Sequence, residues 1–137
     1  MPRRLLRSLA VVALLGSAAT GTAGCATACP AVGYINTATL DTSAFSDVET
    51  VQFCVETECS PVPGEGEASS TNLFMVTPQD DGTWTLGFDM SAPDVVEIRL
   101  FDAQNTLIHE SEHSISWTHS KEPCGGPSEA EPLILEP

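Results

Sequence analysis

The clearest regularity along the chain is an alternation of apolar and polar side chains between residues 83 and 90. Trp84, Leu86, Phe88 and Met90 alternate with Thr83, Thr85, Gly87 and Asp89. Successive side chains of a β-strand point to opposite faces, so a period of two is typical of a strand with one buried face. The pattern predicts such a strand here.

Six further segments show similar but less regular patterns. They span residues 32–40, 48–55, 73–76, 95–101, 107–117 and 133–135. Two turn signals of hairpin length, Asp80-Asp81-Gly82 and residues 102–105, separate neighbouring segments. The connector 60–71, rich in proline, glycine, serine and glutamate, is expected to be the most mobile loop. Together these patterns predict an all-β fold, a seven-stranded antiparallel sandwich of immunoglobulin-like or fibronectin-like type.

The first 24 residues do not share this pattern. Three arginines lie within residues 1–7, residues 9–15 are uninterrupted apolar chain, and residues 16–24 are mostly small. This order of charged, apolar and small regions is typical of an export signal, and the apolar run is too short for a permanent membrane span. We therefore predict a signal peptide at 1–24, a lipidated N-terminus and short tether at 25–30, and the β domain at 31–137.

The junction Thr22-Ala23-Gly24-Cys25 has the form of a bacterial lipobox, in which small residues precede a cysteine that becomes acylated. Thr22 departs from the aliphatic residue that is usual there. Cleavage after Ala28, at the small-x-small site 26–28, is the alternative and would release a soluble secreted protein. We favour an acylated Cys25, which makes the lipid bilayer a partner and predicts the outer face of the cytoplasmic membrane as the location.

Removing the signal makes the chain more acidic. The whole sequence has a net charge of −14, but the first 24 residues hold three of its five basic side chains. From Cys25 onward, two basic side chains stand against nineteen acidic ones, which gives −17. Nucleic acids and anionic lipid headgroups both require a basic face, so the charge argues against either as a ligand. An acidic surface keeps an exported domain soluble.

Four cysteines besides Cys25 form an even set. They are Cys29, Cys54, Cys59 and Cys124. An even number in an exported chain indicates two disulfides. Three pairings are possible, and we predict Cys54 with Cys59 and Cys29 with Cys124. None of these cysteines forms a CxxC pair, so we assign them no metal.

The stretch HESEHSISWTH, residues 109–119, proposes a different function. Apart from Ser116, it fits the pattern HExxHxxGxxH by which metzincin metalloproteases are recognised. In that arrangement His109, His113 and His119 would bind zinc and Glu110 would be the general base. This requires a helix, because the first two histidines must lie one helical turn apart.

Residues 107–117 nevertheless fit a strand better. Leu107, His109, Ser111, His113, Ile115 and Trp117 share one face of a strand, whereas a helix would place Trp117 away from the other apolar residues. In a strand, four residues span about 13 Å, which we take as too far for His109 and His113 to reach one zinc ion. The metzincin glycine is Ser116, and no methionine follows His119. We predict a strand and assign no catalytic residue, metal or cofactor.

Other candidate sites have simpler explanations. Asp80-Asp81-Gly82 lacks the regular ligand spacing of a calcium loop and is expected to be a hairpin turn. Trp84 and Trp117 lie on alternating strands and are expected in the core instead of a carbohydrate or peptide groove. The acidic residues Asp41, Asp47 and Glu49 are expected in a solvated loop.

Several short motifs resemble the small secreted lipoproteins of actinobacteria, for which no activity is assigned. They are Cys25 through Ala28-Cys29-Pro30-Ala31, the pair Cys54 and Cys59, Asp81-Gly82-Thr83-Trp84, and Cys124-Gly125-Gly126-Pro127. The resemblance implies a cell-envelope lipoprotein and leaves its activity open. We therefore predict a membrane-anchored, non-enzymatic binding or structural domain of the envelope, with the zinc metalloprotease as the alternative.

Overall fold

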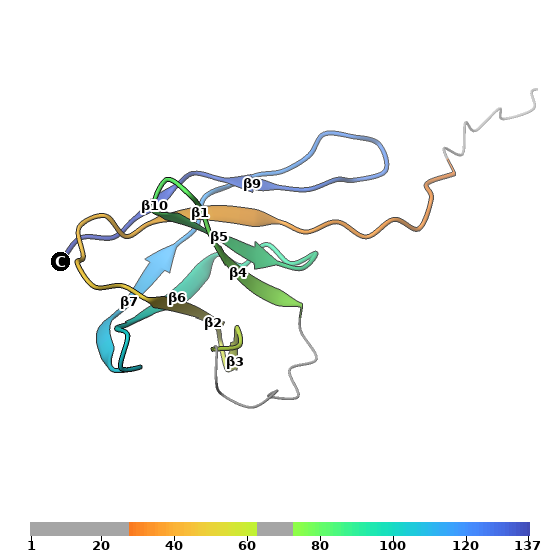
Figure 1. Cartoon of the computed structure of the whole chain (residues 1–137). Coiled ribbons are helices and arrows are strands. Elements are labelled where there is room, and N and C mark those ends of the chain that lie inside the picture. Colours follow the sequence, from red (N-terminus) through yellow and green to blue (C-terminus); the bar gives the residue numbers. More distant parts are fainter. Residues whose placement is uncertain (1–27, 63–72) are drawn as a thin grey trace, which may run out of the picture.

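The structure is a computed structural model, which describes residues 28–62 and 73–137 (Figure 1). Strands form in it where apolar and polar residues alternate along the sequence. In β5, Thr83–Phe88, the apolar Leu86 and Phe88 are fully buried. The described residues contain ten strands and no helix. The chain is therefore all-β, as the period-two patterns predict.

The first sheet, sheet A, has six strands. Its order is β4-β5-β1-β9-β8, and β10 also pairs with β1. The bounds are β1 Thr37–Asp41, β4 Phe74–Pro78, β5 Thr83–Phe88, β8 Trp117–Thr118, β9 Glu129–Ala130 and β10 Leu133–Ile134. On one side of β1 lies β5, and on the other side β9 pairs with the start of β1 and β10 with its end.

The second sheet, sheet B, has four strands in the order β3-β2-β6-β7. The bounds are β2 Thr50–Val55, β3 Glu58–Cys59, β6 Val95–Phe101 and β7 Leu107–Ser114. All of its pairs are antiparallel, and β6 and β7 form a hairpin over their whole length. β7 has a neighbour on one side only, so it is an edge strand of the described sheet.

The two sheets differ from the predicted sandwich in strand number and direction. Each of the seven predicted segments contains an observed strand, but β3 and β9 lie outside them, and β8 was not predicted as a separate strand, since Trp117 was expected to end the strand 107–117. These three have two residues each, which is too short for a period to show. The pairs of β1 with β9 and with β10 are parallel, whereas the prediction was antiparallel throughout.

The core lies between the two sheets, which form the two layers visible in Figure 1. Sheet A contributes Leu40, Leu86 and Phe88, and sheet B contributes Phe53 and Ile98. All five are fully buried, and the rings of Phe53 and Phe88 meet across the layers with centroids 4.6 Å apart. Burying each of these side chains contributes roughly 1.5–3 kcal/mol to folding, before the loss of chain entropy.

Two buried polar residues connect segments that are distant in sequence. The Asn36 side chain donates to the Ser91 carbonyl at 2.7 Å and accepts from the Ser128 amide at 2.6 Å. The Ser60 hydroxyl accepts from the Phe53 amide at 3.0 Å. Each buried group thus has a partner, which removes the cost of an unpaired polar atom.

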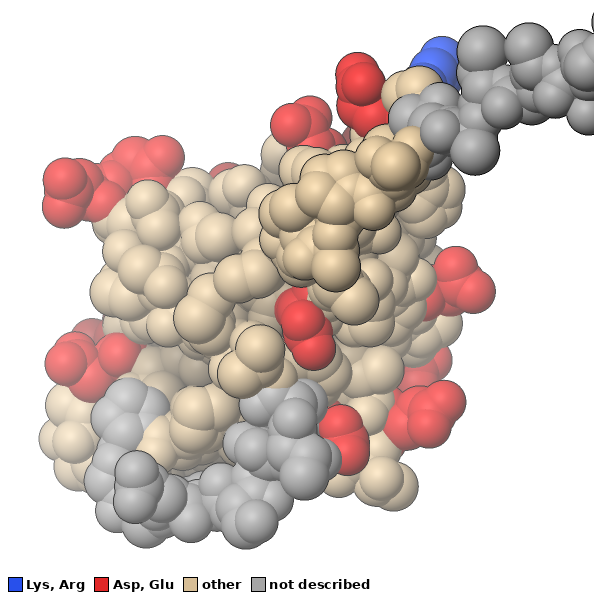
Figure 2. Space-filling model, turned by 90° about the vertical axis from the view of Figure 1, so that its right-hand side faces the viewer, with Lys and Arg blue, Asp and Glu red and all other residues tan. Residues whose placement is uncertain are grey.

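Carboxylates are distributed over the domain surface, as Figure 2 shows for one end of it. Of the basic residues, only Arg99 and Lys121 belong to the described part of the chain. The surface has no extended basic face in this part, which agrees with the charge count from the sequence.

Candidate functional site

The stretch from His109 to His119 runs along β7 and then crosses into sheet A. Residues 107–114 form β7, and Trp117–Thr118 form β8 in the other sheet. The predicted strand is confirmed for residues 107–114 and is interrupted at 115–116, because the chain changes sheets there. A strand does not place His109 and His113 one helical turn apart, as the metzincin arrangement requires.

The third histidine of the motif has a partner of its own. The Nδ1 atom of His119 lies 3.0 Å from the buried Ser128 hydroxyl. Within residues 28–62 and 73–137, no group of three or more histidine, cysteine, aspartate or glutamate side chains is placed to hold a metal ion. The described residues therefore do not gather the three imidazoles around one point.

Three polar side chains of β7 occupy the core-facing side of sheet B. In the β6–β7 register, His109, Ser111 and His113 lie opposite Leu100, Ile98 and Val96 respectively. Directly opposite residues of an antiparallel pair point to the same face, and the three β6 residues belong to the core. We call His109, Ser111 and His113 the inner row of β7; each is half-buried.

A chain of hydrogen bonds runs along this inner row. The Ser111 Oγ atom lies 2.9 Å from the Nε2 atom of His109 and 2.8 Å from that of His113. A serine hydroxyl has one proton, so it donates to one imidazole and accepts from the other. When both rings are neutral they therefore carry their protons on different nitrogens.

The extended backbone separates the two imidazoles less than the sequence argument assumed. Their α-carbons are four residues apart on a strand, but both rings lean inward along β7, and their Nε2 atoms approach the same oxygen. The separation of the two nitrogens is limited by two hydrogen-bond lengths. The sequence argument considered the rise of the backbone and not the reach of the side chains.

The environment of His113 favours the neutral form of its imidazole. Burial lowers the pKa of His113 below its usual 6.5, and the neighbouring His109 lowers it further. The Phe45 ring packs on His109 with a centroid distance of 4.5 Å. Phe45 belongs to the loop between β1 and β2, so this loop holds one end of the inner row.

The glutamate of the motif, Glu110, points to the opposite face of sheet B, where Arg99 pairs with it and with Glu97 of β6. The Arg99 Nε atom donates to Glu110 Oε2 at 2.9 Å, and its Nη2 atom contacts Glu97 Oε1 at 2.5 Å. Glu110 is thus an ion-pair partner on the outer face, away from both imidazoles. It is not placed to act on a water molecule bound to the inner row.

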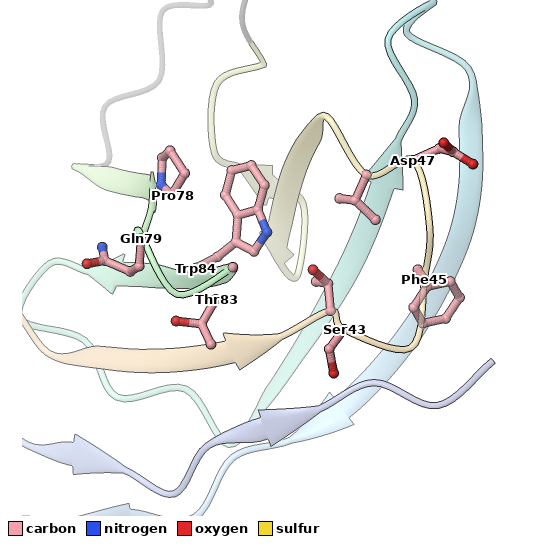
Figure 3. A pocket seen from close by; sticks show the side chains of 10 residues that line it. Ser43, Phe45, Asp47, Pro78, Gln79, Thr83 and Trp84 are labelled. Atoms are coloured by element: carbon pink, nitrogen blue, oxygen red, sulfur yellow. The ribbon is translucent and has the colours of Figure 1, made fainter.

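Beside Phe45 lies an open hollow of about 350 Å³ between the β1–β2 loop and the β4–β5 hairpin. Its lining comprises Thr42, Ser43, Phe45, Asp47, Val48, Pro78, Gln79, Gly82, Thr83 and Trp84. Figure 3 shows the Trp84 ring beside Pro78 on one side of the hollow and Phe45 on the opposite side of the hollow. Aromatic faces combined with hydroxyl, amide and carboxylate groups are suited to a polar ligand with an apolar side.

The aspartates near this hollow form turns. Asp81 Oδ1 accepts from the Thr83 hydroxyl at 2.6 Å and from its amide at 3.0 Å, and these bonds lower the pKa of Asp81. Asp41 Oδ1 accepts from the Ser43 amide at 2.8 Å, which lowers the pKa of Asp41. Residues 80–82 are therefore the hairpin turn that the sequence predicts, with Gly82 at a φ of +83°.

Both predicted disulfides are present. Cys29 is bonded to Cys124, 95 residues later, and Cys54 to Cys59, its direct partner in the β2–β3 pair. The first bond ties the beginning of the described chain to the segment before β9. The predicted lipidation site, Cys25, lies outside the described residues.

Some residues of these sites were not singled out from the sequence. Phe45 lies in a loop without periodicity, and nothing in its neighbourhood predicts a contact with His109. The two tryptophans differ: Trp117 packs edge-on against Phe88 and donates to the Pro93 carbonyl at 2.8 Å, whereas Trp84 also lines the hollow. The expectation of a purely core position is therefore incomplete for Trp84.

Comparison with known proteins gave no relative. No protein-family model matches the chain, and no match was found among curated proteins or solved structures. The described residues contain no helix of the length and apolar character needed to cross a membrane.

Proposed function

We propose that the chain is an extracytoplasmic lipoprotein, held on the outer face of the cytoplasmic membrane by an acylated Cys25. The observation that carries the proposal is the disulfide from Cys29 to Cys124, together with that from Cys54 to Cys59. Such bonds persist in oxidising compartments and are rare in the cytosol. They support export, which the composition of residues 1–24 also predicts.

The same disulfide bears on how the domain is held. Cys29 follows Cys25 by four residues, and an extended chain spans at most about 3.6 Å per residue. The bonded Cys29 would thus lie within about 14 Å of the anchored residue. In this proposal the domain stays close to the bilayer and does not extend from it on a long linker.

We propose a binding or structural role without catalysis. Two surfaces support it: the hollow between Phe45 and Trp84, and the edge strand β7. Loops carried on a rigid β scaffold and exposed strand edges are both common recognition surfaces. The two layers, with hairpins inside each sheet and chain crossings between them, support our proposal of an immunoglobulin-like or fibronectin-like sandwich.

The alternative, a zinc metalloprotease, has less support. Its motif needs a helix at His109 and His113, and these residues lie on β7. Its general base would be Glu110, which pairs with Arg99 on the other face of the sheet.

The anchor is tested by two substitutions at the competing cleavage sites. Cys25→Ala removes the acylated thiol, and the protein is expected to leave the detergent phase in a phase-partitioning assay. Ala28→Leu removes the small residue needed for cleavage after position 28 and is expected to leave partitioning unchanged. If Cys25→Ala stays in the detergent phase, or if only Ala28→Leu changes processing, the lipoprotein proposal is wrong.

A further inference from the structure

The inner row of β7 brings two imidazole nitrogens toward one point. The Nε2 atoms of His109 and His113 both lie within hydrogen-bond distance of Ser111 Oγ. Neutral imidazole is the nitrogen ligand that zinc, copper and nickel ions prefer in proteins. We propose that His109 and His113 together bind one divalent ion of this transition-metal class through their Nε2 atoms.

The geometry requires a modest movement of the rings. Two bonds of about 2.1 Å at a tetrahedral metal place the ligand nitrogens about 3.4 Å apart. The two hydrogen bonds to Ser111 limit the present Nε2 separation to less than twice a hydrogen-bond length. Rotation of the His113 side chain toward His109, which Phe45 holds, brings the nitrogens to the required distance, and the Ser111 hydroxyl turns aside to admit the ion.

The surroundings of the row also favour the binding of an ion. The Phe45 ring restricts the movement of His109 and reduces the entropy lost when that ring is fixed. On the other side of the row, no described strand pairs with β7, so an ion can enter from this edge of the described sheet.

The donor set defines the class of ion. Glu110 is held on the opposite face by Arg99, and no third histidine, cysteine or carboxylate joins the pair among the described residues. Magnesium and calcium prefer oxygen ligands, so a site of two nitrogens disfavours them. Water would complete the coordination shell, and Cu²⁺ should bind most tightly because it heads the stability order of these ions.

The binding test compares the two histidines of the row with the third histidine of the chain. The purified protein is titrated with Cu²⁺ and Zn²⁺ in competition with a chromophoric chelator. His109→Gln and His113→Gln are each expected to weaken Cu²⁺ binding at least tenfold. His119→Gln, which removes an imidazole bound to Ser128, is the matched control and should change binding less than twofold.

A measurement on the unmodified protein guards against variants that fail to fold. Substoichiometric Cu²⁺ should broaden the ring-proton NMR signals of His109 and His113 together and leave those of His119 sharp. Equal broadening of all three histidines would overturn the proposal, as would unchanged affinity in a folded His113→Gln variant. The test does not depend on the lipid anchor, since it concerns the β domain alone.

Discussion

β6 and β7 are neighbours in one sheet, yet their core-facing sides differ in chemistry. β6 presents Val96, Ile98 and Leu100, which are at most 1% exposed. β7 presents a half-buried row of two histidines and a serine directly opposite them. Both strands alternate with a period of two, so their patterns alone do not distinguish a central strand from an edge strand.

The position in the sheet explains the difference. Among the described residues, β6 is paired on both sides, by β2 and β7, whereas β7 is paired on one side only. Polar side chains that point inward on an edge strand discourage pairing with a second chain. The added chain would cover these side chains and remove them from water, which costs free energy. The inner row is therefore positioned to protect the β7 edge of sheet B from pairing with a second chain, as well as to bind an ion.

The largest expected effect comes from truncating the central strand at its middle. Ile98→Ala should lower the free energy of unfolding by about 3 kcal/mol, because it leaves a cavity among fully buried neighbours. Ser111→Ala, at the position directly opposite, should change it by less than about 1 kcal/mol, because both imidazoles can turn to water. Urea denaturation of the two variants measures the contrast, and equal losses would show that the inner row supports folding as much as the core does.

The contrast also shows what the sequence could predict. The apolar and polar pattern locates all six strands longer than two residues and also β10, and the even set of cysteines predicts two disulfides, because these depend on local pattern and count. The two-residue strand β9 depends on pairing with a distant segment, Glu129 with Thr37, and leaves no local trace. The convergence of His109 and His113 on Ser111 depends on side-chain torsions, which a backbone spacing does not fix.

An intermediate effect is expected when the inner row is made apolar. His113→Leu should raise the free energy of unfolding by roughly 1 kcal/mol, because leucine extends the apolar surface of Val96 across the register. It should also increase self-association, because the edge loses a polar inward side chain. Urea denaturation and sedimentation velocity measure the two effects. A loss of stability with an unchanged monomer would show that the hydrogen-bonded row contributes more to folding than to edge protection.

The smallest effect is the pH dependence of stability that His113 contributes. The pKa of His113 is lower in the folded protein than its usual 6.5, first through burial and then through His109. Between the folded pKa and 6.5, the unfolded chain binds more protons, so stability rises with pH across that window. The contribution is complete above pH 6.5 and is lost as the pH falls through the folded value.

Urea midpoints from about pH 5 to about pH 8 should lose this slope in His113→Gln and keep it in His119→Gln. An NMR titration that places the pKa of His113 at or above 6.5 would mean that the row is solvated like the outer face of β7, and the contrast with β6 would then be one of composition and not of environment.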